Sequence, residues 1–358
     1  MHCNPISSII TKSLTSAHIL KITFIFIAIV FTGNLNCFAQ LKRTLLATSK
    51  TNHTLSIINP ATLKIIAVVP VGPNPHEVVV SPNGLKAFVS NPGNSDLHEI
   101  NVIDLQHNKA LPNIDTAPFL GPHGMAYLEN KLWFTAQGSK SVARYDIATS
   151  KFDLAIGTGQ DVTHLLYVTP DSKKFYTTNV DSGTVSIFEN MLVQPTIPPT
   201  GVLPPTAKPH IDWVQTLIPV GKGAEGFDVS PDGKELWTAT PEGLLFIIDL
   251  EAKKISATID TEVLGLHRLK FTPDGKRVAL VSVRTGDLLF YDVKSRKEIK
   301  RIKTGQGAAM LMDAQYNRLF ISCSPNDYIA IIDLKTMEVS GKLEIGGRPD
   351  GLEFAITK

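Results

Sequence analysis

The 358-residue chain has little of what marks several common protein classes. It has only three cysteines, Cys3, Cys37 and Cys323, so a disulfide-rich scaffold is excluded and stability must come from packing. Charged residues make up 19% of the chain and nearly balance, with 35 Lys and Arg against 33 Asp and Glu. A nucleic-acid partner and a polybasic membrane patch are therefore not expected. With 43% hydrophobic residues, the composition is that of a folded globular protein.

The N-terminal apolar stretch is too short to cross a bilayer. Residues 22–31 form an apolar run of ten residues, whereas a membrane helix needs about 20. The run follows two lysines and precedes small residues at Cys37 and Ala39, which is typical of a secretory signal cleaved after Ala39. A lipid-modified Cys37 and an uncleaved N-terminal anchor are the alternatives. We expect a periplasmic, secreted or cell-surface protein with no transmembrane domain in its mature chain.

A five-residue pattern recurs seven times after this leader. Each copy starts with apolar residues and ends in small, mostly polar ones, and successive copies start 42, 45, 43, 61, 42 and 41 residues apart. Such a period indicates a repeat architecture. The copies are residues 45–49 (LLATS), 87–91 (AFVSN), 132–136 (LWFTA), 175–179 (FYTTN), 236–240 (LWTAT), 278–282 (VALVS) and 319–323 (LFISC).

A second column has nearly the same spacing. After each copy, an apolar stretch ends in Asn, Asp or Glu, and these ends lie 45, 42, 43, 60, 43 and 41 residues apart. Two columns with one period make the repeat a strong signal. The second column consists of Asn59, Asp104, Asp146, Glu189, Asp249, Asp292 and Asp333.

The unit has the size and the turn chemistry of a propeller blade. Four units contain a Ser/Thr-Pro-Asn/Asp turn, at residues 81–84, 169–172, 230–233 and 272–275, each between two apolar runs. A unit of about 40–45 residues with four short strands is a β-propeller blade. The sequence therefore predicts an all-β fold, a seven-bladed β-propeller with four antiparallel strands per blade.

The two ends of the chain are expected to share one blade. Residues 346–354 resemble the first strand of a further unit, and residues 43–71 supply the three strands that it lacks. Pairing them closes the ring and leaves no exposed sheet edge. The predicted organisation is a signal peptide over 1–39 and a single propeller over 40–358. A proline-rich insertion at 191–210 explains the 61-residue interval and is predicted to be an extended loop.

These tracts resemble the signature of the YVTN-repeat β-propellers, a family of exported bacterial and archaeal proteins. Residues 175–179 are the closest copy, and the resemblance runs from Arg43 to the C-terminus. It implies the propeller fold and an exported protein. Related rings include lactonase-type propellers and the haem-binding propeller of some nitrite reductases, so the fold alone does not specify the function.

One position in the repeat holds half of the histidines outside the leader. It lies five residues before the turn, where the chain enters the inner strand. The chain has ten histidines, two of them in the predicted leader, and four of the other eight occupy this column. Propeller geometry places the column at the mouth of the central channel. Around the ring the column consists of His76, His123, His164, Glu225, His267, Ala308 and Asp350.

The column suggests a ligand-binding site. Two arginines adjoin it and are suited to hold an anionic group by bidentate hydrogen bonds. A structural interpretation competes with this one, in which the histidines cap the inner strands by bonding the backbone of a neighbouring blade. The predicted ligand-binding residues are His76, His123, His164, Glu225, His267, Asp350, Arg268 and Arg348.

A metal site is one specific form of this prediction. The imidazoles of His76, His123 and His164 and the carboxylate of Glu225 are ligands that Zn²⁺, Cu²⁺ or Fe²⁺ accepts. A divalent metal with an open coordination position would activate water or polarise a carbonyl there.

Stronger enzymatic motifs are absent from the sequence. There is no Gly-x-Ser-x-Gly elbow, no phosphate-binding glycine loop, no Cys-x-x-Cys pair and no Cys-x-x-Cys-His haem attachment motif. Three functions remain: a propeller that binds a small molecule or protein partner at its channel mouth, a metal-dependent enzyme of lactonase or lyase type, and an accessory protein that holds haem or copper non-covalently. We expect a monomer.

Overall fold

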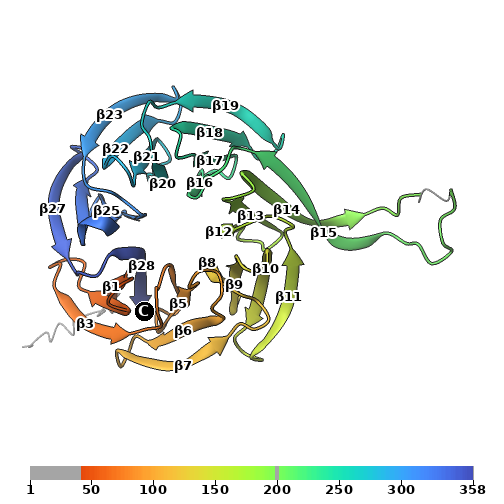
Figure 1. Cartoon of the computed structure of the whole chain (residues 1–358), viewed down its shortest axis with the longest axis horizontal. Helices are drawn as coiled ribbons and strands as arrows, with labels where there is room; N and C mark the ends of the chain where they lie inside the picture. The colour runs from red at the N-terminus through yellow and green to blue at the C-terminus, as the bar shows by residue number, and fades with distance from the viewer. Residues whose placement is uncertain (1–41, 198–200, 358) are drawn as a thin grey trace, which may run out of the picture. The chain divides into compact units, whose positions relative to one another are not determined.

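The computed structural model describes residues 42–197 and 201–357, and these form seven four-stranded antiparallel sheets in a ring (Figure 1). The predicted leader, its cleavage site, Cys3 and Cys37 lie outside the described residues. Within those residues no helix is long and apolar enough to cross a bilayer, and the one short helix is a 3₁₀ turn, η1 (Ser324–Asn326). The predicted fold, a seven-bladed β-propeller, is confirmed.

Each blade runs from an innermost strand at the channel to a fourth strand at the rim. The innermost strands are β4 (Val78–Val80), β8 (Pro122–Leu128), β12 (Thr163–Val168), β16 (Phe227–Val229), β20 (Leu266–Phe271), β24 (Ala309–Asp313) and β28 (Pro349–Thr357). The second strands are β1 (Lys42–Ser49), β5 (Lys86–Asn91), β9 (Lys131–Ala136), β13 (Lys174–Asn179), β17 (Glu235–Ala239), β21 (Arg277–Ser282) and β25 (Arg318–Cys323). The third strands are β2 (Thr54–Ile58), β6 (Glu99–Asp104), β10 (Ser141–Asp146), β14 (Thr184–Val193), β18 (Leu244–Asp249), β22 (Asp287–Asp292) and β26 (Tyr328–Asp333). The rim strands are β3 (Ile65–Pro70), β7 (Lys109–Asp115), β11 (Lys151–Gly157), β15 (His210–Pro219), β19 (Lys254–Asp260), β23 (Lys297–Lys303) and β27 (Glu338–Glu344).

The two ends of the described chain close the ring, as predicted. Strand β28 from the C-terminal end pairs antiparallel with β1 from the N-terminal end, in a sheet with the order β28-β1-β2-β3. The register runs from Lys42 opposite Thr357 to Ser49 opposite Pro349. This pairing satisfies the backbone groups that an open ring would leave exposed.

The core consists of seven apolar clusters, because both faces of a blade are covered by its neighbours. The tract of β5 shows how this works. Ala87 and Val89 pack into one cluster, while Phe88, between them, packs into the next cluster around the ring. Consecutive apolar residues in each tract therefore serve two different interfaces. Full burial of a Val, Leu, Ile or Phe side chain contributes about 1.5–3 kcal/mol to the free energy of folding, so the interfaces between blades supply much of the stability.

The last residue of the tract on β25 is also part of this packing. Cys323 is fully buried in an apolar cluster, and burial raises the pKa of its thiol to about 11. A thiol that stays protonated is a poor nucleophile. The expectation that Cys323 is packed rather than catalytic agrees with this environment.

The second column of the repeat turns the chain from the third strand to the rim strand. The Oδ1 atom of Asp104 accepts hydrogen bonds from the backbone N–H groups of Gln106 and His107, at 2.9 and 3.0 Å. Asx side chains hold such turns because they replace a backbone acceptor. The same pair of bonds is made by Asn59, Asp146, Asp249 and Asp333.

The exception in this column marks the proline-rich insertion. At Glu189 the chain does not turn, because β14 continues to Val193 and β15 returns from His210 opposite it. The prediction of an extended loop over 191–210 is therefore wrong at its two ends, where residues 191–193 and His210 are paired strand. The hairpin projects from the ring (Figure 1), and its apolar side chains Leu192 and Ile211 are 52% and 64% exposed.

Close backbone contacts between blades suggest a first test of the fold. Gly351, on the closing strand β28, donates its backbone N–H to the carbonyl of His76 at 2.9 Å, and a Cβ at position 351 would overlap that carbonyl oxygen. The variant Gly351→Ala should therefore lose about 1–3 kcal/mol of unfolding free energy, the usual cost of overpacking. Urea unfolding followed by circular dichroism measures it.

Gly157 provides the matched control for this substitution. It lies at the end of a rim strand, where a Cβ would meet no atom within 4 Å, so Gly157→Ala should leave the unfolding free energy unchanged or slightly higher. Equal stability of the two variants would contradict the proposed packing at the closing blade.

Candidate functional site

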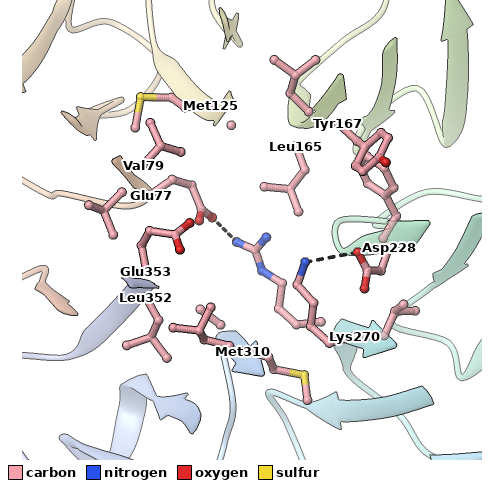
Figure 2. A pocket seen from close by; sticks show the side chains of 18 residues that line it. Glu77, Val79, Met125, Leu165, Tyr167, Asp228, Lys270, Met310, Leu352 and Glu353 are labelled. Atoms are coloured by element: carbon pink, nitrogen blue, oxygen red, sulfur yellow. Dashed lines mark hydrogen bonds and ion pairs between the residues drawn. The ribbon is translucent and has the colours of Figure 1, made fainter. Parts of the chain in front are cut away.

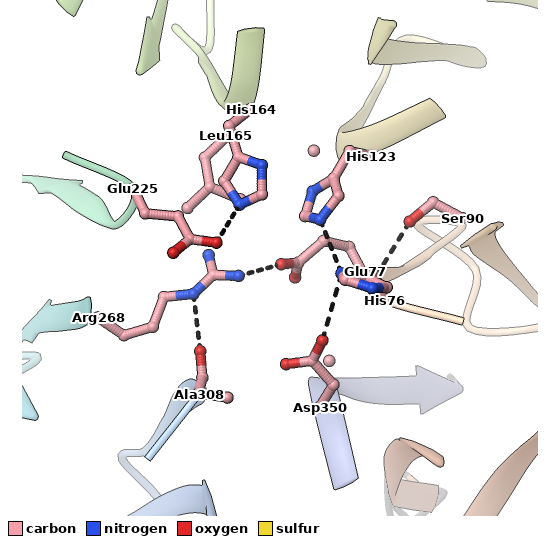
Figure 3. A network of polar contacts seen from close by, with 12 residues as sticks. His76, Glu77, Ser90, His123, His164, Leu165, Glu225, Arg268, Ala308 and Asp350 are labelled. Atoms are coloured by element: carbon pink, nitrogen blue, oxygen red, sulfur yellow. Dashed lines mark hydrogen bonds and ion pairs between the residues drawn. The ribbon is translucent and has the colours of Figure 1, made fainter. Parts of the chain in front are cut away.

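The predicted column lies where the chain enters the innermost strands. Figure 3 shows the side chains of its members His76, His123, His164, Glu225 and Asp350 pointing toward one another at the axis of the ring. In three blades the column residue comes one or two positions before the strand begins, namely His76, Glu225 and Ala308. The structure thus brings the column together at one mouth of the channel. In four blades the column residue is the second residue of its strand, namely His123, His164, His267 and Asp350.

A β-bulge at the column breaks the alternation of inward and outward side chains. The pairing register shifts between Pro122 and Met125 in one blade, and between Leu266 and Arg268 in another. A bulge adds one residue to one strand, so two consecutive side chains can point to the same side. Arg268 therefore faces the channel although its neighbour His267 is the column residue.

The backbone of the column is held by the neighbouring blade. The hydroxyl of Thr135, the fourth residue of its tract, donates to the carbonyl of His164 at 2.6 Å. Thr178 donates in the same way to the carbonyl of Glu225 at 2.7 Å. These bonds assign a role to the small polar residues that end the tracts. The other two such bonds are Thr48 to His76 and Ser322 to Asp350, at 3.0 and 2.6 Å.

The side chains of the column do not make the backbone caps that the structural interpretation required. The Nε2 atom of His123 lies 2.8 Å from the Nδ1 atom of His76, so one neutral ring donates and the other accepts. His76 Nδ1 also lies 3.5 Å from the Asp350 carboxylate, which Lys50 holds at 2.7 Å. The hydrogen bonds of His76 and His123 are therefore made to other side chains of the mouth.

A second group occupies the opposite side of the mouth. The carboxylate of Glu225 lies between two imidazoles, 2.8 Å from His164 Nε2 and 2.7 Å from His267 Nδ1. The ring of His164 also packs against the ring of His123 at a tilt of 34°, with centroids 3.9 Å apart, and this contact joins the two groups. Four imidazoles and two carboxylates thus form one continuous polar network.

An ion pair between two residues that are distant in the sequence crosses the channel below this network. Arg268 reaches the carboxylate of Glu77 at 2.5 Å, and its Nε–H donates to the carbonyl of Ala308 at 2.9 Å (Figure 3). Glu77 and Arg268 are 191 residues apart in the sequence. The predicted binding residue Arg268 is therefore already paired, and the pair separates the mouth from the interior of the channel.

Burial keeps the paired imidazoles neutral. Desolvation lowers the pKa of His76 to about 4, and the nearby charges of Lys50 and Arg268 act in the same direction against Asp350. His123 is 1% exposed, and burial together with the adjacent histidines holds its pKa well below the ordinary value. Both rings therefore offer one donor and one acceptor at neutral pH.

The carboxylates of the mouth stay ionised in spite of their burial. Desolvation alone would raise the pKa of Glu225, but the charges and hydrogen bonds of His267 and His164 outweigh it and hold that pKa well below the usual range. Burial opposes ionisation of Asp350 in the same way, and Lys50 with His76 lowers its pKa overall. Each carboxylate already has its partners.

The predicted metal ligands face one another in pairs. Among residues 42–197 and 201–357, no group of three or more His, Cys, Asp or Glu side chains is arranged to hold a metal ion. The Nδ1 atoms of His123 and His164 are buried without a hydrogen-bond partner. A ligand that rotated these rings would satisfy those atoms, but the present donor arrangement does not fit a metal site.

Arg348 lies beside the network rather than in it. Its backbone N–H donates to Asp327 Oδ1 at 2.8 Å, and its exposed side chain lines a shallow pocket at the rim of the mouth with Lys50, His53 and Asn74. The structure therefore joins seven of the eight predicted binding residues in contacts at the mouth and leaves Arg348 on its edge.

Sequence reasoning missed Lys50 and Glu77, and it also missed the interior of the channel. A cavity of about 190 Å³ lies below the mouth, lined by residues from all seven innermost strands (Figure 2). Its charged residues Asp228, Lys270 and Glu353 each come three positions after a column residue. A count at this spacing along the repeat would have found them.

The depressed pKa of His76 predicts a pH-dependent stability. Because the folded ring titrates at about 4 and the unfolded one at 6.5, the unfolded state binds more protons between these values, and stability falls as pH drops from 6.5 to 4. Over this pH range the unfolding free energy of His76→Asn should fall less than that of the wild type, by up to about 3 kcal/mol. Urea unfolding at pH 7 and pH 4.5 measures the difference.

His98 supplies the control for this titration. It is exposed and paired with Asp115, which raises its pKa, so His98→Asn should not reduce the loss of stability at low pH. If His76→Asn lost as much unfolding free energy between pH 7 and pH 4.5 as the wild type, the pKa of His76 would not be depressed.

Comparisons with known proteins agree on the fold and leave the family open. No protein-family model and no curated protein matches the sequence. A candidate 6-phosphogluconolactonase from Bacteroides uniformis ATCC 8492 is a similar solved structure, with a TM-score of 0.68 and 14% identity over 87% of this chain and 99% of its own.

Two further solved structures have the same architecture. A protein of unknown function from Desulfotomaculum acetoxidans DSM 771 has a TM-score of 0.66 and 13% identity over 88% of this chain and 99% of its own. Dihydro-heme d1 dehydrogenase NirN in complex with DHE has a TM-score of 0.60 and 17% identity over 85% of this chain and 63% of its own. At these identities the likeness shows the β-propeller fold alone.

Proposed function

We propose that this chain is an exported propeller of the YVTN type that binds a small, uncharged polar ligand at its channel mouth. The binding residues are the joined side chains of the column, with His123 and His164 at the centre. The observation that carries the proposal is the pair of buried imidazole nitrogens, Nδ1 of His123 and of His164, that have no hydrogen-bond partner within the described residues. Buried polar atoms are rarely left unpaired, and a binding site is one place where they are.

The charges of the mouth favour an uncharged ligand. Asp350 is neutralised by Lys50, Glu77 by Arg268, and Glu225 lies between His164 and His267. An ionic ligand would have to compete with these ion pairs. A hydroxyl or carbonyl compound needs only hydrogen-bonding atoms such as the unpaired Nδ1 atoms of His123 and His164. The fold shared with a candidate lactonase and with NirN supports a binding or enzymatic role for such a ring.

The metal-dependent enzyme and the haem or copper accessory are the competing functions. A metal ion needs three or more donor atoms that face one point. His76 and His123 bond each other and Glu225 is engaged by two imidazoles, so no third free ligand joins the unpaired Nδ1 atoms of His123 and His164 within residues 42–197 and 201–357. We therefore favour the metal-free binding function. No other feature of the site favours either competing function.

Histidine resonances provide a direct test, because four of the eight histidines in the described residues lie at the mouth and three lie away from it. Protein labelled with ¹³Cε1-histidine is titrated with glucono-δ-lactone and with a panel of uncharged polyols and amides. A binding probe should shift the signals of the mouth histidines and leave the others in place. His123→Ala should weaken that binding at least tenfold, about 1.4 kcal/mol. The control signals are those of His98, His107 and His210.

Two results would contradict the proposed function. The first is a set of probes that move only the control histidines, or none at all. The second is about one equivalent of Zn, Cu or Fe in protein purified without an affinity tag, lost in His123→Ala while circular dichroism stays unchanged. That second result would favour the metal-dependent enzyme or the metal-binding accessory instead.

A further inference from the structure

The interior of the channel contains one carboxylate, that of Glu353, that belongs to none of the ion pairs described above. Below the bridge of Arg268 and Glu77, Lys270 lies 3.2 Å from Asp228, which also accepts the backbone N–H of Phe271 at 2.9 Å. Glu353 lies on the wall of the same cavity (Figure 2). Within residues 42–197 and 201–357, no Lys, Arg or His side chain forms an ion pair with it at 4.0 Å or less.

The surroundings of Glu353 do not compensate its charge. Its Oε1 accepts one hydrogen bond, from the backbone N–H of Phe354 at 2.8 Å. Burial and the nearby charge of Glu77 raise the pKa of the carboxyl, and the hydrogen bond and Lys270 offset this only in part. A buried carboxylate without a cation is costly, so a cation that entered the cavity would be stabilised there.

The cavity opens at the end of the channel opposite the histidine mouth. A second cavity, of about 430 Å³, is lined by residues at the far ends of the innermost strands, among them Ser81, Tyr127 and Phe354. It shares five lining residues with the interior cavity, so the two cavities adjoin each other. The shared residues are Val79, Met125, Leu166, Tyr167 and Glu353.

The lining selects an organic cation over a metal ion. Ca²⁺ and Mg²⁺ need about six oxygen ligands, whereas this end of the channel offers a single free carboxylate among apolar side chains. Tyr127 and Tyr167 are half-buried in the wall, and Met125 lies near them. Aromatic side chains that line a cavity together with a carboxylate are surroundings that suit ammonium groups.

We propose that the far end of the channel binds a small organic ammonium ion, with Glu353 as its counter-ion and Tyr127, Tyr167 and Met125 around its alkyl groups. The interior cavity of about 190 Å³ has room for a group of a few heavy atoms, since one water occupies about 30 Å³ of liquid. The site is separate from the histidine mouth, because the ion pair of Arg268 and Glu77 lies between them.

Titration calorimetry with tetramethylammonium chloride tests this site. Sodium chloride controls for ionic strength, and 2,2-dimethylpropanol is an uncharged probe of similar shape. The wild type should bind tetramethylammonium and neither control. Glu353→Gln keeps the shape of the side chain and removes its charge, so it should weaken the binding at least tenfold.

Two variants separate this site from the rest of the molecule. Glu344→Gln removes an exposed carboxylate on the rim strand β27 and should bind tetramethylammonium like the wild type. His123→Ala should also bind tetramethylammonium with wild-type affinity, so this test does not depend on whether the histidine mouth binds a ligand. Equal affinities in the wild type and in Glu353→Gln, or no binding by the wild type, would overturn the proposal. Circular dichroism of Glu353→Gln establishes that a loss of binding is not a loss of fold.

Discussion

The antiparallel pairing of β28 with β1 is the constraint on which the rest of the molecule depends. It joins residues about 300 positions apart, Leu46 opposite Glu353 for example, and thereby closes seven sheets into a ring. Closure is what places Asp350 beside Lys50 and His76, and it sets Glu353 in the channel wall. An open chain of blades would hold the same side chains far apart, and neither the mouth nor the interior would exist.

The chemistry of the mouth follows from burial more than from the identity of its residues. Histidine at an exposed position titrates near neutral pH, but packing against neighbouring blades removes water from His76 and His123 and leaves them neutral. The carboxylates behave differently because they have partners: Glu225 keeps its charge between two imidazoles. The network is therefore polar with its charges compensated internally, which is why it suits hydrogen bonding better than the capture of ions.

The channel is divided by one ion pair into regions of different character. Above Arg268 and Glu77 the walls are imidazoles and carboxylates, and below them they are largely aliphatic and aromatic. Position along the inner strand accounts for this. Residues at the start of some inner strands, such as His123 and Asp350, are polar, whereas later residues such as Val79 and Met125 belong to the apolar wall.

By itself the sequence determined the repeat, the seven blades, the closing blade and the column at one channel mouth, because these follow from spacing and from turn chemistry that is local in the chain. It also located the insertion, although not the paired strands at its two ends. The tertiary structure alone decided which side chains are partners. His76 with His123, Arg268 with Glu77 and the isolation of Glu353 depend on bulges, on the curvature of the ring and on contacts across the channel, and none of these has a signature in the order of residues along the chain.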